Sequence, residues 1–325
     1  MTSENMTGYK AGIDIGGTKT MFCITDALGE IVLIERRATT AHSRPERFFQ
    51  WLFGELQVLL AGFPLEIEQL IGIGIGFPGV IGDTEGILSH APALPWPAVN
   101  IRPLIRNYYK GLLYLDNDVN LALLGERDKG AAQNKEHVLM ITVGTGIGSA
   151  LLLNGQLYKG ADYTAGEVGY FVVEVSETQQ ASASGTSFGP LEAVASGTGI
   201  TAHARAYFAA GSRGSLISEL AASREEQIGA RHVLEAAAKG DAAALQIMDK
   251  PLNHMAAGIA NAVSLLNPQM VVIGGGVADS GSYYVNEISN RVRLYTPFPV
   301  VIRPALLGNT AGAIGAAAAV TAKPQ

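Results

Sequence analysis

The chain has 325 residues, enough to bury the cores of two domains. Its 29 acidic residues outnumber its 23 basic ones, and a net charge of −6 without a basic stripe argues against a nucleic-acid-binding surface. No apolar run reaches the roughly 18 residues of a membrane span, and the first residues lack the layout of a signal peptide, so we expect a cytoplasmic protein that binds no membrane.

The first predicted element is a strand that ends in a double glycine. Apolar residues flank Asp14, and the run Gly16-Gly17-Thr18-Lys19-Thr20 turns the chain back into a second strand. Backbone N–H groups of such a turn can approach a phosphate, and its threonine and lysine side chains add donors and a positive charge. Asp14, at the strand end, can hold a hydrated Mg²⁺ on the same phosphates. The alternative for this segment alone is an ordinary β-turn beside a strand-end aspartate.

A second ligand-binding position is predicted further along the first half of the chain. An amphipathic helix is expected at Pro45–Leu60, with strands at Ile71–Ile75 and Leu112–Leu115. The second of these strands runs into Asp116-Asn117-Asp118, and a helix is expected to follow. A carboxylate at a strand end before a helix lies where α/β proteins bind ligands. The alternative is that Asp116 or Asp118 only caps the helix.

The strand–glycine turn–strand pattern then occurs a second time. Its turn is Gly144-Thr145-Gly146-Ile147-Gly148, and 128 residues separate its first glycine from Gly16. In both copies a further turn and a third strand follow, with Asn154-Gly155 as the hairpin signal in the second copy. This repetition predicts a duplicated domain with a phosphate-binding turn in each copy.

The second half of the chain is predicted to be mostly helical. Helices are expected at Ile200–Ala210, Ala230–Lys239 and Ala242–Leu266, and strands at Val271–Ile273 and Val300–Ile302. Gly274-Gly275-Gly276 follows the first of these strands, where the backbone can pack against a flat ligand such as adenine or against a neighbouring helix. Residues 176–187, rich in Ser, Ala and Gln, are predicted to form a surface loop. Strands that alternate with helices indicate an α/β layer architecture.

Eight segments occur in the order in which one family carries them: GIDIGGTKT, GFPGVIG, LDNDVNLALLGE, ITVGTGIGSALLLNGQLYKG, AGEVGY, GPLEAVASGTGI, NPQMVVIGGGV and GNTAGAIGAA. On these segments, from Gly12 to about Ala319, the chain resembles the ROK family of sugar kinases and sugar-responsive repressors. The resemblance implies the actin/hexokinase-like ATPase fold, an α/β fold of duplicated ribonuclease H-like domains. In that fold the last helix returns to the first domain. We therefore expect a small N-terminal domain of residues 10–117 plus 310–325 and a large C-terminal domain of residues 118–309.

The resemblance also implies an activity, the transfer of the γ-phosphoryl group of ATP to a hexose hydroxyl, with Mg²⁺ as cofactor. The 6-OH of glucose is the first expectation, and mannose, fructose or an N-acetylhexosamine are the alternatives. A homodimer is implied as well. A non-catalytic sugar-binding regulator is the alternative from a different class. Family repressors carry a DNA-binding winged helix before the first turn, and the residues before Gly12 leave no room for one, so we expect a kinase.

Site residues follow from the resemblance position by position. The general base corresponds to Asp118 and the neighbouring sugar-binding residue to Asn117, while Asp116 is assigned no chemistry. The turns Gly16–Lys19 and Gly144–Gly146, together with Gly275 and Gly276, would bind ATP. Further sugar contacts correspond to Gly79, Glu167 and Glu192, because buried carboxylates accept hydrogen bonds from sugar hydroxyls well.

One departure from the family concerns a zinc that many members hold with a histidine and three cysteines. Tyr170 occupies the histidine position, and alignment on Glu192 places Ala183, Gly185 and Pro190 at the cysteine positions, so we expect no zinc. In the family that histidine also contacts the sugar. Tyr170 therefore leaves the identity of the sugar open, since its hydroxyl can bind the sugar or its ring can pack under the 176–187 loop.

Overall fold

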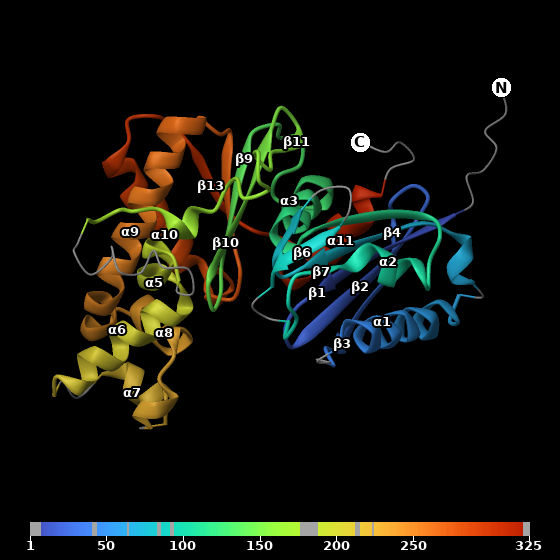
Figure 1. Ribbon diagram of the computed structural model, residues 1–325. Helices are drawn as coiled ribbons and strands as arrows, with labels where there is room; N and C mark the ends of the chain where they lie inside the picture. Colours follow the sequence, from blue (N-terminus) through green and yellow to red (C-terminus); the bar gives the residue numbers. More distant parts are fainter. Residues whose placement is uncertain are drawn as a thin grey trace. The chain divides into compact units, whose positions relative to one another are not determined.

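The computed structural model describes residues 8–40, 44–63, 65–82, 86–91, 94–175, 188–211, 215–222 and 224–320. The chain divides into two compact units (Figure 1). Unit 1 comprises Met1–Asn134, Lys159–Ala165 and Asn309–Gln325, and unit 2 comprises Lys135–Tyr158 and Gly166–Gly308. The surface loop predicted at 176–187 lies outside the described residues. Within the described ranges, no helix combines the length and the apolar character that crossing a membrane requires.

The central sheet of unit 1 has the strand order β3-β2-β1-β4-β8. Its strands are β1 (Tyr9–Ile15), β2 (Lys19–Asp26), β3 (Ile31–Ala38), β4 (Leu70–Phe77) and β8 (Leu112–Asn117). The first three are antiparallel because tight turns join them, whereas β4 and β8 run parallel to β1 because the helices α1 (Pro45–Leu60) and α2 (Ile101–Arg106) lie in their connections. A small antiparallel sheet of β5 (Val80–Gly82), β6 (Ile87–His90) and β7 (Val99–Asn100) lies between β4 and β8 in the chain.

The central sheet of unit 2 repeats this topology, with the strand order β11-β10-β9-β12-β13. Its strands are β9 (Val138–Val143), β10 (Ile147–Leu153), β11 (Gln156–Leu157), β12 (Met270–Gly274) and β13 (Val301–Pro304). Again three antiparallel strands are followed by two parallel ones. Two sheets with the same order and the same strand directions confirm the duplication expected from the two glycine turns.

Helices occupy the two long connections of the unit 2 sheet. They are α5 (Pro190–Ala195), α6 (Gly197–Ala209), α7 (Leu216–Leu220), α8 (Ala230–Ala238) and α9 (Ala242–Leu266) before β12, and α10 (Ser282–Tyr295) after it. Helix α6 begins earlier than predicted because Ser196 caps it, its Oγ accepting from the backbone N–H of Gly199 at 3.1 Å.

The last helix, α11 (Ala311–Ala319), lies against β1 and β4 and beside α3 (Asp118–Lys129), all within unit 1 (Figure 1). Gly12 of β1 and Gly74 of β4 permit this approach, because a Cβ at these positions would lie 2.0 and 1.9 Å from carbonyl oxygens of α11. Gly125 does the same for α3, where a Cβ would lie 2.2 Å from the carbonyl oxygen of Ala311. Because α3 packs in this way, the division between the units lies after Asn134, whereas the sequence interpretation divided the chain after residue 117.

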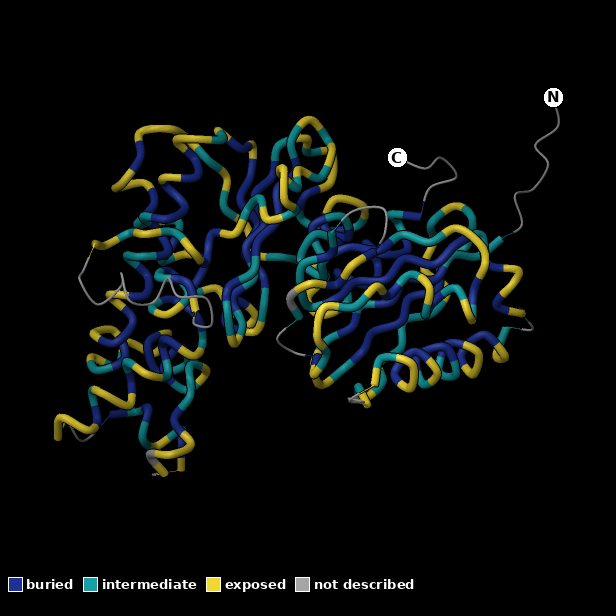
Figure 2. The backbone as a smooth tube through the Cα atoms, viewed as in Figure 1, coloured by how far each residue is buried: buried dark blue, intermediate teal, exposed yellow. Residues whose placement is uncertain are grey.

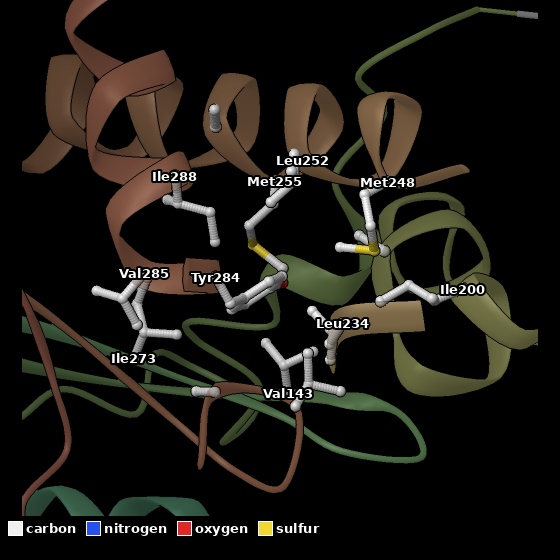
Figure 3. Packing of buried hydrophobic residues seen from close by; sticks show 14 of the residues in the cluster. Val143, Ile200, Leu234, Met248, Leu252, Met255, Ile273, Tyr284, Val285 and Ile288 are labelled. Atoms are coloured by element: carbon white, nitrogen blue, oxygen red, sulfur yellow. The ribbon is translucent and has the colours of Figure 1, made fainter. Parts of the chain in front are cut away.

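Each unit has its own hydrophobic core, visible as the buried strands and helix faces in Figure 2. In unit 1, α1 buries Phe48, Phe49 and Leu52 within the cluster that includes the strands of the sheet. In unit 2, Tyr284 of α10 lies at the centre of the core, near Met255 of α9 and Val143 of β9 (Figure 3). The packing of each unit therefore positions the strand ends of its own sheet.

Candidate active site

The end of β8 and the start of α3 form a turn that is closed by Asn117. Its Oδ1 accepts from the backbone N–H groups of Val119 at 2.8 Å and Asn120 at 3.3 Å, so Asn117 is the N-cap of α3. Its Nδ2 donates to the carbonyl oxygen of Gly79 at 3.1 Å. Asp118 is the first helical residue, and its Oδ1 accepts from the N–H of Val119 at 2.8 Å. The turn thus joins three of the predicted sugar-site residues, and the cap is Asn117 rather than Asp116 or Asp118.

Two acidic residues of unit 1, Asp14 and Asp118, both lie beside Gly76 of β4. Asp14 of β1 is the parallel-strand partner of Gly76, and a Cβ on that glycine would lie 3.4 Å from Asp14 Oδ1 and 3.5 Å from the Cα of Asp118. Burial, and to a lesser extent the negative charge of Asp118, raise the pKa of the Asp14 carboxyl to about 8 against the opposing effect of Lys19. Two neighbouring acidic side chains suit a hydrated Mg²⁺, because carboxylate oxygens are its preferred ligands and the cation would offset the repulsion between the two negative charges.

The first glycine turn is held by hydrogen bonds that use its carbonyl groups. Gly16 N donates to the carbonyl oxygen of Lys19 at 2.9 Å, and the N–H of Thr39 donates to the carbonyl oxygen of Thr18 at 3.0 Å. The Thr39 hydroxyl donates to the carbonyl oxygen of Gly16 at 2.8 Å. Among the described residues no backbone carbonyl accepts from the N–H of Gly17 or Thr18. These two consecutive donors fit a phosphate group.

The second glycine turn has the same arrangement with different supports. Gly144 N donates to the carbonyl oxygen of Gly146 at 2.9 Å. The start of α6 holds the turn from outside, since Gly197 N donates to the carbonyl oxygen of Gly144 and the hydroxyl of Thr198 to that of Thr145, both at 2.8 Å. Within the described ranges the N–H groups of Thr145 and Gly146 have no backbone acceptor. A Cβ on Gly144 would meet no atom within 4 Å, whereas a Cβ on Gly146 would lie 2.2 Å from Glu192 Oε1, so of these two glycines only Gly144 borders open space.

Gly275 and Gly276, after β12, differ from one another. Gly275 has a φ of +88°, and a Cβ there would lie 2.5 Å from the carbonyl oxygen of Val143. A glycine is therefore required here because β9 approaches closely. The close neighbour is this strand, whereas the sequence allowed a neighbouring helix. A Cβ on Gly276 would meet nothing within 4 Å. Only Gly276 of this pair borders open space.

Glu192 binds two backbone groups of unit 2. Its Oε1 accepts from Ile147 N at 2.9 Å, directly after the second glycine turn, and its Oε2 accepts from Gly189 N at 3.2 Å. Glu192 therefore connects the start of α5 with the glycine turn, a link that its spacing in the sequence did not indicate. A sugar contact would have to use the remaining lone pairs of these oxygens.

Of the other predicted sugar-site and zinc-site positions of unit 2, Glu167 and Tyr170 are exposed, Pro190 is half-buried, and two lie outside the described residues. Glu167 is exposed and precedes the short 3₁₀ turn Val168–Tyr170. Tyr170 is 58% exposed. Pro190 begins α5, whereas Ala183 and Gly185 lie outside the described residues. In the part of the chain that the structure describes, no group of three or more His, Cys, Asp or Glu residues could hold a metal ion.

Asp116 is a site feature that the sequence interpretation missed. The residue is only 3% exposed. It accepts hydrogen bonds from Asn117 N and Asn120 Nδ2, both at 2.8 Å, and from the Tyr114 hydroxyl at 3.0 Å, and its Oδ2 lies 2.6 Å from Lys159 Nζ. The available signal was an acidic residue at the end of a strand that is otherwise apolar, directly before the Asn–Asp pair.

Comparison with known proteins shows the family and the fold of this chain. The model of the ROK family matches residues 10–323. The chain is 33% identical to a glucokinase of Halalkalibacterium halodurans over 94% of this chain and 93% of that protein. It is 27% identical to a putative xylose repressor of a Caldicellulosiruptor species over 86% of this chain and 69% of that protein. A ROK glucokinase structure from Streptomyces griseus, in complex with glucose and AMPPNP, covers 96% of this chain at a TM-score of 0.76 and 26% identity, with 98% of that chain matched. These matches confirm the actin/hexokinase-like ATPase fold expected from the sequence.

Proposed function

This chain belongs to the ROK family, and from that premise we propose that it is an ATP-dependent sugar kinase whose acceptor is the 6-OH of glucose. The observation that carries the proposal is the arrangement at Gly76. There, Asp118 and Asp14 lie beside each other in the unit that also holds the first glycine turn and the Asn117–Gly79 contact. Its glucokinase relatives and the AMPPNP complex of a relative support the choice of sugar and of ATP.

In this proposal Asp118 is the general base. Phosphoryl transfer to an alcohol requires a carboxylate within hydrogen-bond reach of the attacking hydroxyl, and this carboxylate takes the proton as the P–O bond forms. Asn117 would orient the sugar. One of the two Nδ2 hydrogens of Asn117 is used by the carbonyl of Gly79, which leaves the second for a ring hydroxyl.

In each unit the glycine turn offers backbone N–H groups that suit a phosphate group of ATP. Gly17 and Thr18 supply two N–H groups in unit 1, and Thr145 and Gly146 supply two in unit 2. Lys19, whose Nζ donates to Asn309 Oδ1 at 2.5 Å, adds a positive charge beside the first turn. Asp14 is the residue that would hold Mg²⁺ through water, and bound Mg²⁺ would neutralise charge on the phosphoryl oxygens.

In unit 2 the resemblance indicates three sugar contacts: Glu192, Glu167 and Tyr170. Glu192 retains lone pairs beyond its two backbone contacts, and Glu167 is exposed to solvent and therefore reachable by a ligand. Tyr170 presents a phenol where the family has a histidine. We therefore expect this residue to influence which hexose binds. We propose that Tyr170 contacts the sugar and that the zinc of other family members is absent.

A coupled ADP-release assay with ATP and Mg²⁺ over a panel of hexoses and N-acetylhexosamines tests the proposal. We expect the highest kcat/KM with glucose. Turnover with another sugar alone would retain the kinase and correct the acceptor. If calorimetry shows that a sugar binds but no sugar is phosphorylated, a non-catalytic sugar-binding regulator would be favoured instead. The putative xylose repressor among the relatives provides a precedent for this alternative.

A further inference from the structure

Asp116 is a buried carboxylate that lies two residues before the proposed base. A buried carboxylate that stays ionised needs a partner of opposite charge and donors for both of its oxygens. Lys159 supplies the charge at 2.6 Å, and its side chain is 29% exposed. The ring of Tyr114 lies 5.7 Å from Lys159 Nζ, so the ammonium group contacts both the carboxylate and an aromatic face.

The two oxygens of Asp116 have different partners. Oδ2 receives the ammonium of Lys159 and the hydroxyl of Tyr114. Oδ1 receives Asn117 N and Asn120 Nδ2, which lie on either side of Asp118 in the chain. Because the carboxylate is planar and rigid, the position of Oδ2 at Lys159 determines where Oδ1 meets the turn. With four donors around it and almost no exposed surface, Asp116 is not available to a sugar itself.

Lys159 comes from an unusual part of the chain. The segment Lys159–Ala165 belongs to unit 1, although the residues immediately before and after it belong to unit 2. The segment is closed by a hydrogen bond from Ala165 N to the carbonyl oxygen of Lys159 at 3.0 Å, and Gly160 within it has a φ of +74°. The lysine is therefore presented to Asp116 from an ordered loop, 43 residues away in sequence.

We propose that the Lys159–Asp116 ion pair is a positioning device that holds the Asn117–Asp118 turn where its carboxylate meets the acceptor hydroxyl. The proposal rests on the proposed kinase function for its catalytic consequence. Lys159 and Asp116 act through Asn117 and Asn120 and touch no substrate. Their loss should therefore affect the rate of phosphoryl transfer more than the binding of the sugar or of ATP.

Kinetics of Lys159→Met, Lys159→Arg and Lys129→Met test this role. Lys129 is the matched control, because it is a lysine of unit 1 with 26% exposure whose Nζ lies 3.2 Å from an exposed carboxylate, Glu30. We expect Lys159→Met to lower kcat by about 10- to 100-fold with little change in the KM for the sugar, since misplacement of a reacting group costs rate. Lys159→Arg should restore most of the rate, and Lys129→Met should stay within about twofold of the parent.

A double-mutant cycle with Asp116→Asn separates pairing from general damage. If Lys159 acts through the carboxylate, Lys159→Met should cost much less in the Asp116→Asn background than alone. Additive losses, or a wild-type kcat in Lys159→Met, would overturn the proposal. Phosphorylation of a sugar by the parent protein and by Lys129→Met establishes the kinase function independently of Lys159. A failure of the positioning proposal can therefore be distinguished from a failure of the proposed function.

Amide hydrogen exchange provides a readout that does not need turnover. In Lys159→Met, exchange in a peptide covering residues 116–121 should be about tenfold faster than in the parent and in Lys129→Met, because the contacts that hold the turn are lost. Peptides of β9 and β10 should be unaffected, which identifies a local effect. Unchanged exchange at 116–121 would overturn the proposal even for a protein without kinase activity. If Lys159→Met fails to fold, Asp116→Asn replaces it: faster exchange at residues 116–121 supports the proposal, and unchanged exchange overturns it.

Discussion

Unit 1 and unit 2 share one sheet topology but differ at the residues next to their glycine turns. The position two residues before the turn is Asp14 in unit 1 and Thr142 in unit 2, and each lies beside a glycine of the next parallel strand, Gly76 and Gly274 respectively. The Thr142 hydroxyl donates to the carbonyl oxygen of Gly148 at 3.3 Å and so serves its own hairpin. The carboxylate of Asp14 instead lies near that of Asp118.

The last parallel strands differ as well. Strand β8 ends in Asn117 and leads into Asp118, whereas β13 ends at Pro304 and is followed by Ala305. In unit 2 the carboxylate of Glu192 accepts from the backbone N–H groups of Ile147 and Gly189. Both units carry N–H donors that suit phosphate, while the carboxylates that we propose as general base and as cation ligand, Asp118 and Asp14, belong to unit 1.

The largest expected effect tests whether unit 1 carries the chemistry. Asp118→Asn should lower kcat by about 10²- to 10⁴-fold, because it removes the general base while an amide of the same shape can still bind the sugar. Calorimetry should show nearly unchanged sugar affinity. Asp128→Asn, the same change at an exposed position of the same helix, is the control and should keep the parental rate. Parental turnover in Asp118→Asn would place the base elsewhere.

A paired substitution at the equivalent positions sharpens the contrast between the units. Asp14→Asn should reduce activity by about 10- to 100-fold and raise the Mg²⁺ concentration that half-maximal activity requires, as expected for a group that holds a metal through water. Thr142→Val removes only the contact with Gly148 and should leave the Mg²⁺ dependence unchanged. Equal shifts in both variants would contradict the assignment of the cation to unit 1.

The two glycines after β12 should respond differently to alanine. Gly275→Ala places a Cβ against Val143 at a positive φ and should destabilise unit 2 by about 1–3 kcal/mol, measured as a lower Tm. Gly276→Ala has room for its methyl group and should keep the Tm while raising the KM for ATP. A raised KM for ATP without loss of Tm in Gly275→Ala would show that this glycine faces the ligand rather than β9.

A smaller effect is expected at Asp241, the N-cap of α9. Burial alone would raise the pKa of this carboxyl, but the N–H groups of Ala244 and Leu216 and the Ser215 hydroxyl lower it below its ordinary value of 3.8. A carboxyl with a lowered folded-state pKa adds stability above its unfolded pKa, and this stability is lost as the pH falls through the folded pKa. Asp241→Ala should therefore cost about 1 kcal/mol at pH 7. The cost should shrink in urea titrations below pH 3.8, and a pH-independent difference would contradict the charge argument.

The smallest effect is expected from treatment with a chelator, because we expect this protein to hold no zinc. Residues 165–192 correspond to the segment in which many family members bind zinc. Metal analysis of the purified protein should find no stoichiometric zinc, because tyrosine, alanine, glycine and proline stand at the ligand positions. Treatment with a strong chelator, with Mg²⁺ restored afterwards, should leave the Tm and the circular dichroism spectrum unchanged. One tightly bound zinc per chain would mean that this region was misaligned.

Local sequence determined many of the strands and helices of this protein and the places of its two glycine turns. The two strand–turn–strand motifs and the helix at Pro45–Leu60 depend on neighbours within a few residues, so hydrophobic periodicity and glycine were sufficient to predict them. The same holds for the duplication, because each copy carries its own turn signals. The cap of α3 was predicted wrongly, because the sequence offered Asp116 or Asp118 and the structure has Asn117.

Tertiary structure alone decided which distant groups meet. Asp14 approaches Asp118 because β1, β4 and β8 are parallel neighbours and Gly76 lies between the two acids. Helix α11 accounts for Gly12 and Gly74, which have no local reason to be glycine. Lys159 reaches Asp116 from a segment whose chain neighbours belong to the other unit. Such contacts depend on strand pairing and backbone approach between residues far apart in the chain, and no periodicity or spacing within a single segment encodes them.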